Sequence, residues 1–311
     1  MARKPSKPRR TKKAKSAAPK TTRTKARTKA GKPVRRARAA RPTKPRQAVQ
    51  PTMKAHSRVT AGQSQGSPAA SMLAATDVTA AGNTAHFNVS YQSDLGQQGA
   101  DLAQAILQNC ERDFASLQQI FGGLTPQRMP IVVHITSGSG GASHLGCLGT
   151  AISVGGNTDG GVDFIRSLLV MEVTEVFMAN FGRGWNCAAS PGEGLSRVIA
   201  NDLYKGVEPG DFISSNQWLN LEDRVNYVDR SDPTDTNYDS IGCSVLFLNW
   251  LRFQLNHTWA DIVAASGATL ANTYKNLTGK VSAWADFTAF LNAHFPGSQW
   301  YDLDSDNPFP V

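Results

Sequence analysis

The feature that most constrains this chain is a long apolar helix with carboxylates inside it. Residues 162–180 are apolar almost throughout, which is typical of a helix that is buried on all sides, yet Glu172 and Glu175 lie within this stretch. These two glutamates are three residues apart and therefore share one face of the helix. Glu193 opens the next predicted helix, 192–205. Because an unpaired carboxylate is costly to bury, the three glutamates need a cationic partner, a metal ion or an open cleft.

The basic residues are concentrated at the N-terminus. Residues 1–58 hold 22 of the 33 Lys and Arg, and the first acidic residue is Asp77. The rest of the chain therefore has 11 basic and 24 acidic residues, a net charge of −13 within an overall charge of +9. A Lys, Arg, Pro, Ala and Thr-rich segment without apolar periodicity cannot bury a core, so we expect residues 1–58 to be a disordered arm.

The composition of this arm is similar to that of histone-like basic tails. We expect it to bind nucleic acid or another polyanion, because Lys and Arg that neutralise phosphates release counterions. A solvated polycation without a specific partner and an organelle presequence are the alternatives.

The remaining chain divides by composition into a linker and a folded domain. Residues 59–83 are rich in Ser, Gly, Ala and Thr and predict a flexible linker. Residues 84–311 are long enough to bury a core as one globular domain. In this domain the predicted strands come early and the predicted helices late, which is the order of an α+β fold.

The individual elements follow from hydrophobic periodicity and from Gly and Pro positions. Strands are expected at residues 86–91, 130–135 and 146–155, and helices at 97–121, 162–180, 192–205, 241–257, 259–265, 270–277 and 281–294. An irregular C-terminal tail, 295–311, is expected to pack back on the domain through Phe295, Trp300, Tyr301 and Phe309.

Hydropathy and cysteine usage bear on the compartment. No apolar run of about 18 residues occurs and the N-terminus has no signal-peptide apolar core, so we expect no membrane partner. The four cysteines, Cys110, Cys147, Cys187 and Cys243, form no C-x-x-C pair, which argues against a zinc ribbon or a thioredoxin-type site. We expect buried free thiols, with a single disulfide as the alternative. A cytoplasmic or nucleoid-associated location is favoured, although the sequence leaves the compartment open.

The order of a strand, an edge-like strand, a buried helix with acidic positions and a helix that opens on a glutamate resembles the gluzincin, aminopeptidase N-like branch of the zincin metallopeptidases. In that family an H-E-x-x-H helix supplies two zinc-binding histidines and a general-base glutamate, and a Glu-Gly helix start supplies the third ligand. Here Glu193-Gly194 is similar to the Glu-Gly start. The later Tyr-containing helix of the family is similar to Tyr238, Gly242, Leu248, Leu251 and Arg252.

The resemblance covers residues 131–254 and implies a zincin-like domain with a small N-terminal sheet, a buried active-site-type helix and a helical C-terminal lobe. It places Glu172 at the general-base position and Tyr238 near the oxyanion. It places Met171 and Glu175 at the two histidine positions and Glu193 at the third ligand. Because Met is a weak ligand and zinc prefers nitrogen and sulfur donors, we expect a degenerate site without a cofactor. If a divalent metal such as Zn, Mn or Mg binds, Glu175 and Glu193 are its expected ligands, with Glu172 and Tyr238 as the catalytic residues.

Other roles for the three glutamates stay open. They could form structural ion pairs, hold a hard cation such as Mg²⁺, Mn²⁺ or Ca²⁺, or act as a metal-free carboxylate pair in acid/base catalysis. The arginines that could form such ion pairs are Arg197 for Glu193, and Arg166 or Arg183 for Glu172 or Glu175. The histidines that could be brought to the site in space are His134, His144 and His257.

The leading hypothesis is a gluzincin-like pseudo-peptidase that acts by binding, with a peptide or protein ligand in its cleft. Its basic arm would tether it to nucleic acid or another polyanion. One alternative is a metal-dependent hydrolase or peptidase with a carboxylate-rich site. The other is a histone-like, DNA-associated structural protein.

Overall fold

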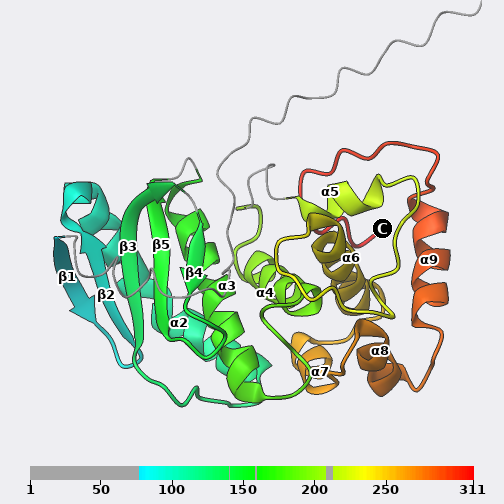
Figure 1. The fold of residues 1–311 in the computed structure, drawn as a ribbon, viewed down its shortest axis with the longest axis horizontal. Coiled ribbons are helices and arrows are strands. Elements are labelled where there is room, and N and C mark those ends of the chain that lie inside the picture. The colour runs from blue at the N-terminus through cyan, green and yellow to red at the C-terminus, as the bar shows by residue number, and fades with distance from the viewer. Residues whose placement is uncertain (1–76, 140, 158–159, 208–212) are drawn as a thin grey trace, which may run out of the picture. The chain divides into compact units, whose positions relative to one another are not determined.

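The computed structural model of the 311-residue chain describes residues 77–139, 141–157, 160–207 and 213–311. The predicted arm, 1–58, and residues 59–76 of the predicted linker lie outside the described residues. The strands are β1 (Val78–Asn83), β2 (Phe87–Gln92), β3 (Ile131–Ser139), β4 (Ala142–His144) and β5 (Ala151–Asn157). The α-helices are α2 (Gly96–Ile120), α3 (Gly161–Phe181), α4 (Ser190–Leu203), α5 (Ser214–Leu219), α6 (Tyr238–Asn249), α7 (Trp259–Ala264), α8 (Leu270–Thr278) and α9 (Ala283–His294). The fold is therefore α+β, as the order of the predicted elements indicated (Figure 1).

The strands form one mixed sheet in the order β1-β2-β3-β5-β4. Strands β2, β3 and β5 run parallel, and the two edge strands, β1 and β4, run antiparallel to their neighbours. Parallel neighbours require a crossover connection, which α2 provides between β2 and β3. The short edge strand β4 pairs His144 with Ile152 of β5. This pairing fixes where the His144 side chain leaves the sheet.

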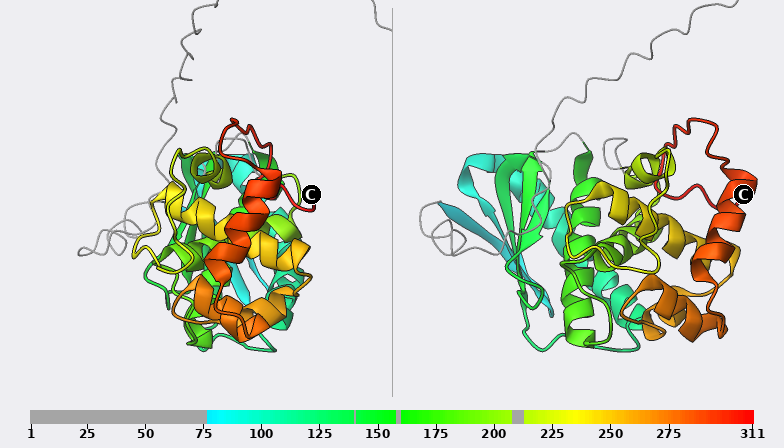
Figure 2. Two further views of the ribbon diagram at one scale, coloured as in Figure 1. Left: turned by 90° about the vertical axis from the view of Figure 1, so that its right-hand side faces the viewer. Right: turned by 45° about the vertical axis from the view of Figure 1, so that its right-hand side comes forward.

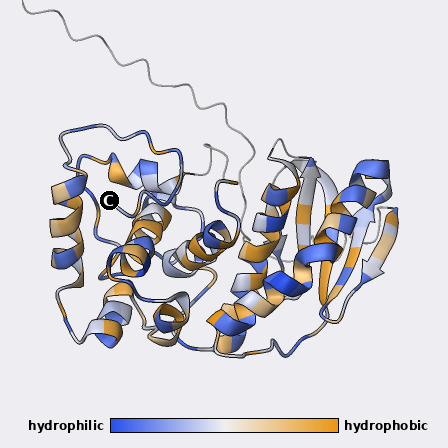
Figure 3. Cartoon of the chain, turned by 180° about the vertical axis from the view of Figure 1, so that it is seen from behind, coloured by the Kyte–Doolittle hydropathy of each residue, from blue (hydrophilic) through white to orange (hydrophobic). Residues whose placement is uncertain are grey.

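One face of the sheet carries most of its buried side chains. Along β2, β3 and β5 the buried residues alternate with more exposed ones, and Figure 3 shows the corresponding hydrophobic and hydrophilic bands along the strands. The buried set consists of Phe87, Val89, Ile131, Val133, Ile135, Ile152 and Val154. Helices α2 and α3 contact the sheet, and α2 does so through residues at helical spacing such as Leu102, Ile106 and Phe114. This alternation is what a sheet covered on one face requires.

Helix α3 lies between the sheet and the helical part of the domain (Figures 1 and 2). It contacts β4 and β5 on one side and α4 on the other, so that its apolar residues are buried almost all round. The helix ends at Gly182, whose φ of 66° is the left-handed conformation that glycine adopts most readily. The predicted helix 162–180 is confirmed to within one residue at each end.

Helices α4 to α9 form the rest of the core. Helix α6 lies between α4 and α5, and a π-helical segment, Trp250–Gln254, extends it. Aromatic side chains from these helices pack together, namely Trp218, Phe247, Trp250, Tyr274 and Phe287. The helices predicted at 241–257, 259–265, 270–277 and 281–294 are confirmed in type, with boundaries shifted by a few residues.

Four predictions about local structure need correction. Strand β1 lies within the predicted linker, because its Thr, Ala and Gly residues are held by main-chain pairing with β2 rather than by apolar burial. The strand predicted at 146–155 begins only at Ala151, as β5, because a turn precedes it, and the short strand β4 before that turn was not predicted. Helix α5 was not predicted. In the tail, Trp300 is 77% exposed, whereas Phe295 and Phe309 are buried as expected.

In the part of the chain that the structure describes, no helix combines the length and the apolar character that a membrane crossing requires.

Candidate functional site

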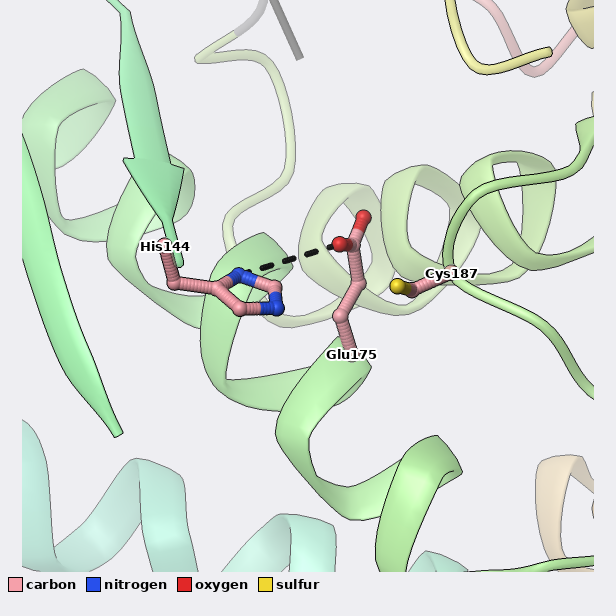
Figure 4. A group of neighbouring side chains, drawn as sticks. All are labelled: His144, Glu175 and Cys187. Carbon is pink, nitrogen blue, oxygen red and sulfur yellow. Dashed lines mark ion pairs between the residues drawn. The ribbon is translucent and has the colours of Figure 1, made fainter. Parts of the chain in front are cut away.

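Side chains from four segments meet at the C-terminal end of β4. His144 ends that edge strand, Glu172 and Glu175 lie on α3, Cys187 lies in the loop after α3, and Glu193 lies in the first turn of α4. Figure 4 shows three of them side by side, with His144 and Cys187 on either side of Glu175. The sequence predicted that the three glutamates face a common region, and in the structure the charges of Glu193 and Glu172 both raise the pKa of the Glu175 carboxyl.

His144 is the histidine that the fold brings to the glutamates. Its Nδ1 lies 2.7 Å from a carboxylate oxygen of Glu172 and 3.9 Å from one of Glu175. The His144 side chain is only 4% exposed, so these contacts are made largely out of water. Of the other two candidates, His134 contacts Ser90 on the neighbouring strand, and His257 follows the π-helical segment, where its backbone N–H donates to the Leu251 carbonyl.

Glu193 forms a buried ion pair with Arg197 one turn further along α4. The Arg197 Nε lies 3.1 Å from a Glu193 oxygen, and both side chains are less than a tenth exposed. The guanidinium of Arg197 also lies 5.5 Å from the ring centre of Tyr238, at the start of α6. The predicted Glu193–Arg197 pair is therefore confirmed. Tyr238 is close to this pair, through its ring face.

The other predicted ion pairs do not form. Arg166 pairs with Asp163 at 2.7 Å, and the guanidinium of Arg183 lies over the Phe181 ring. The prediction was wrong for Glu172 because His144, which is remote in sequence, is its partner. Helical spacing shows only neighbours on the same helix.

Glu175 is the glutamate of this group whose carboxyl pKa is raised by its surroundings. Burial raises the pKa of its carboxyl well above the ordinary value of 4.5, and the nearby charges of Glu193 and Glu172 raise it further. A hydrogen bond with Glu193 also favours the protonated form, while the Ser196 hydroxyl, which donates to Glu175 at 3.3 Å, favours the carboxylate. Burial and the two neighbouring carboxylates thus all favour the protonated form of Glu175.

A disulfide closes one side of the site. Cys147, in the turn after β4, is bonded to Cys187, and their Cα atoms are 5.8 Å apart. The expectation of free thiols was wrong for this pair and right for Cys110 and Cys243, which are free and buried. The two bonded cysteines are 40 residues apart, so that only the pairing of β4 with β5 and the packing of α3 bring them together.

One group of side chains has the composition of a metal site. Ligand atoms of His144, Glu175 and Cys187 all lie within 4.8 Å of one another. However, the Cys187 sulfur is already bonded to Cys147, and a disulfide sulfur is not the thiolate that binds metals. With the disulfide closed, this set therefore offers two ligands.

The predicted metal and catalytic residues are arranged differently from a zinc site. Met171, at the first histidine position, packs against Tyr204 and lines a cavity of about 20 Å³ between α3 and α4. That cavity has room for about one water molecule. Glu193 is bound to Arg197, and Glu175 is deeply buried beside it. Glu175 and Glu193 are thus close together, but each is engaged by protein groups.

The glycines beside Glu193 have a packing role. A Cβ on Gly194 would lie 2.6 Å from the Cβ of Ser244, and one on Gly192 would lie 1.9 Å from the carbonyl oxygen of Asn186. The Gly-Glu-Gly sequence therefore allows α4 to approach both α6 and the preceding loop. This close packing is a sufficient reason for both positions to be glycine, so that no bound ligand is needed to account for them.

The charges of this cluster also act on the pKa values of two acids that the sequence analysis did not single out, Asp235 and Asp306. Burial raises the pKa of Asp235, and the charge of Glu193 raises it further. Burial also raises the pKa of Asp306, and the charge of Arg197 opposes this effect. Both residues lie far from α4 in the sequence, in segments without periodicity, so no sequence signal marked them.

Comparisons of the chain with protein-family models, with curated proteins and with solved structures find no match. The site must therefore be interpreted from its own geometry. With the disulfide closed, it is a buried, hydrogen-bonded cluster of three acids, one imidazole and one guanidinium.

Proposed function

We propose that this chain is a degenerate gluzincin-like binding protein, a pseudo-peptidase, which its basic arm tethers to nucleic acid or another polyanion. One observation carries the proposal: each of the three glutamates has a protein partner. Glu172 is paired with His144, Glu193 with Arg197, and Glu175 with Ser196 and Glu193. Carboxylates that are satisfied in this way need no metal ion to be buried.

The order of elements supports the resemblance to the gluzincins. A strand, an antiparallel edge strand, a buried helix with two glutamates and a helix that opens on a glutamate follow one another as β3, β4, α3 and α4, with β5 between β4 and α3. A helical lobe, α5 to α9, follows.

The residues at the family's zinc positions do not fit zinc. Met171 offers only a thioether beside a cavity of about 20 Å³, and Glu193 is neutralised by Arg197, so that Glu175 is the one carboxylate of these three positions left for a metal. Zinc sites are built from at least three available nitrogen, sulfur or oxygen donors. We therefore derive no hydrolytic step from these positions.

The proposal is tested on the full chain with its disulfide intact, purified without chelators or a His-tag. We expect no stoichiometric metal by inductively coupled plasma analysis, and no cleavage of a mixed peptide library by the wild type. A metal that disappears in Glu193→Ala, or cleavage that disappears in Glu172→Gln, would instead establish the metal-dependent hydrolase.

A further inference from the structure

One sulfur atom, that of Cys187, belongs both to the disulfide and to the group of candidate metal ligands. We propose that the Cys147–Cys187 disulfide gates a zinc site: when a dithiol reduces it, Cys187 becomes the third ligand beside His144 and Glu175. This inference concerns the reduced chain and does not rest on the proposed function, which concerns the oxidised one.

The three donors have the types and the spacing that zinc needs. An imidazole nitrogen, a carboxylate oxygen and a thiolate sulfur are its usual ligands, at about 2.0–2.3 Å from the metal, which places tetrahedral ligand atoms about 3.5 Å apart. The candidate ligand atoms lie within 4.8 Å of one another, so movements of about an ångström would bring them to this geometry.

Glu172 orients the imidazole for this role. Its carboxylate lies 2.7 Å from Nδ1 of His144, and Nε2 makes no hydrogen bond to any described residue. Metal-binding histidines commonly give one ring N–H to a carboxylate, which fixes the ring and makes the other nitrogen a better donor. Glu172 would thus be a positioning residue, and Nε2 the ligand atom.

The two cysteines differ in how firmly they are held. Cys187 is buried between Trp185, whose indole N–H donates to the Val263 carbonyl, and the start of α4. Cys147 lies in a turn whose neighbours are among the most exposed apolar residues of the described chain, Leu145 at 70% and Leu148 at 48%. Reduction would therefore release the turn and leave Cys187 beside His144 and Glu175.

The exchange balances with a dithiol as the reductant. One dithiol thiolate attacks the accessible Cys147 sulfur, forms a mixed disulfide and releases the Cys187 thiolate. The second thiol of the reductant then closes its own disulfide and releases Cys147 as a thiol. Zinc binds the Cys187 thiolate, the neutral His144 and the Glu175 carboxylate, whose proton passes to water. Two anionic ligands neutralise the charge of the ion, and water completes the tetrahedron.

Cobalt(II) is the probe that separates this site from adventitious binding, because a bound thiolate gives a charge-transfer absorption. The full chain is dialysed against cobalt(II) or zinc(II), either oxidised or after reduction by a phosphine that adds no competing thiol. We expect about one ion per chain with the thiolate absorption in the reduced form, and neither in the oxidised form. Uptake by the oxidised chain with the same absorption would overturn the proposal, as would its absence after reduction.

Two matched variants remove the same disulfide and differ in which sulfur remains. Cys147→Ser should take up cobalt with the thiolate absorption and without a reductant, whereas Cys187→Ser should not do so in either state. Cys187→Ser keeps Cys110 and Cys243, and therefore controls for these thiols. His144→Gln in the Cys147→Ser background should weaken binding at least tenfold. Equal uptake by the two cysteine variants would contradict the assignment. Circular dichroism is used to check that both variants are folded, and the reduced wild type tests the site without either substitution.

Discussion

His144 and Glu172 are 28 residues apart in sequence, and their side chains meet at 2.7 Å. One residue ends the edge strand β4 and the other lies in the middle of α3. The contact supplies the partner that a buried glutamate needs, and it leaves the second ring nitrogen of His144 for another ligand. His144 thus contacts Glu172 while the disulfide is closed, and in the proposed reduced form it keeps this contact and also binds the metal.

Glu175→Gln should make the protein more stable at high pH. Because the folded-state pKa of Glu175 is raised above 4.5, the stability that its proton contributes is fully present below about pH 4.5 and is lost as pH rises through the folded pKa. Within that window the wild type loses up to about 1.4 kcal/mol per pH unit relative to the glutamine variant. Urea denaturation at a series of pH values measures the difference.

Glu111→Gln is the control with the opposite sign. Burial raises the pKa of Glu111, but the hydrogen bonds with His86 and Thr84 outweigh this effect and lower it. Its contribution should therefore be present above about pH 4.5 and lost as pH falls. If both variants changed with pH in the same direction, the raised pKa of Glu175 would be refuted.

Arg197→Met should destabilise the fold by about 3–5 kcal/mol, because it leaves the Glu193 carboxylate buried without its partner. The combined change Glu193→Leu and Arg197→Met should recover part of this loss, since neither charge is then buried alone. The measurement is a double-mutant cycle by urea denaturation.

The exposed pair of Lys205 with Asp202 serves as the comparison for this cycle. Its lysine side chain is 75% exposed, so Lys205→Met should change the free energy of unfolding by less than about 1 kcal/mol. A small effect at Arg197, similar to that at Lys205, would show that the Glu193 pair is not isolated from water.

Opening the disulfide should cost stability even before any metal is added. A crosslink between residues 40 apart restricts the unfolded chain by about 4 kcal/mol in the loop-entropy model. Cys147→Ser and Cys187→Ser should therefore both unfold at lower urea concentrations than the oxidised wild type. Zinc should restore stability to Cys147→Ser alone, because a ligand that binds only the folded state stabilises it.

Removal of residues 1–58 should abolish binding to duplex DNA. These residues hold 22 of the 33 basic side chains, and the rest of the chain carries a net charge of −13. For the full chain, the logarithm of the association constant should fall linearly with the logarithm of salt concentration. Fluorescence anisotropy with unrelated DNA sequences measures this slope. Retained binding by the truncated chain, which keeps β1, would place the nucleic-acid site in the folded domain and refute the tethering role of the arm.

The sequence alone determined the features that depend on local periodicity. The all-round apolar pattern of 162–180 predicted α3 almost to its ends, because hydrophobic residues at every helical face specify a buried helix. The spacing of Glu193 and Arg197 predicted their ion pair, since residues four apart on a helix are neighbours. The three glutamates were thereby expected in one region.

Only the tertiary structure decided which partners these glutamates have. The register of β4 on β5 places His144 against Glu172, and the same turn brings Cys147 to Cys187 across 40 residues. No helical or strand period connects such residues, because their proximity depends on strand order and on the packing of α3 against the sheet. Sequence spacing fixes contacts within an element, and the contacts between elements arise only when the sheet and the helices pack together.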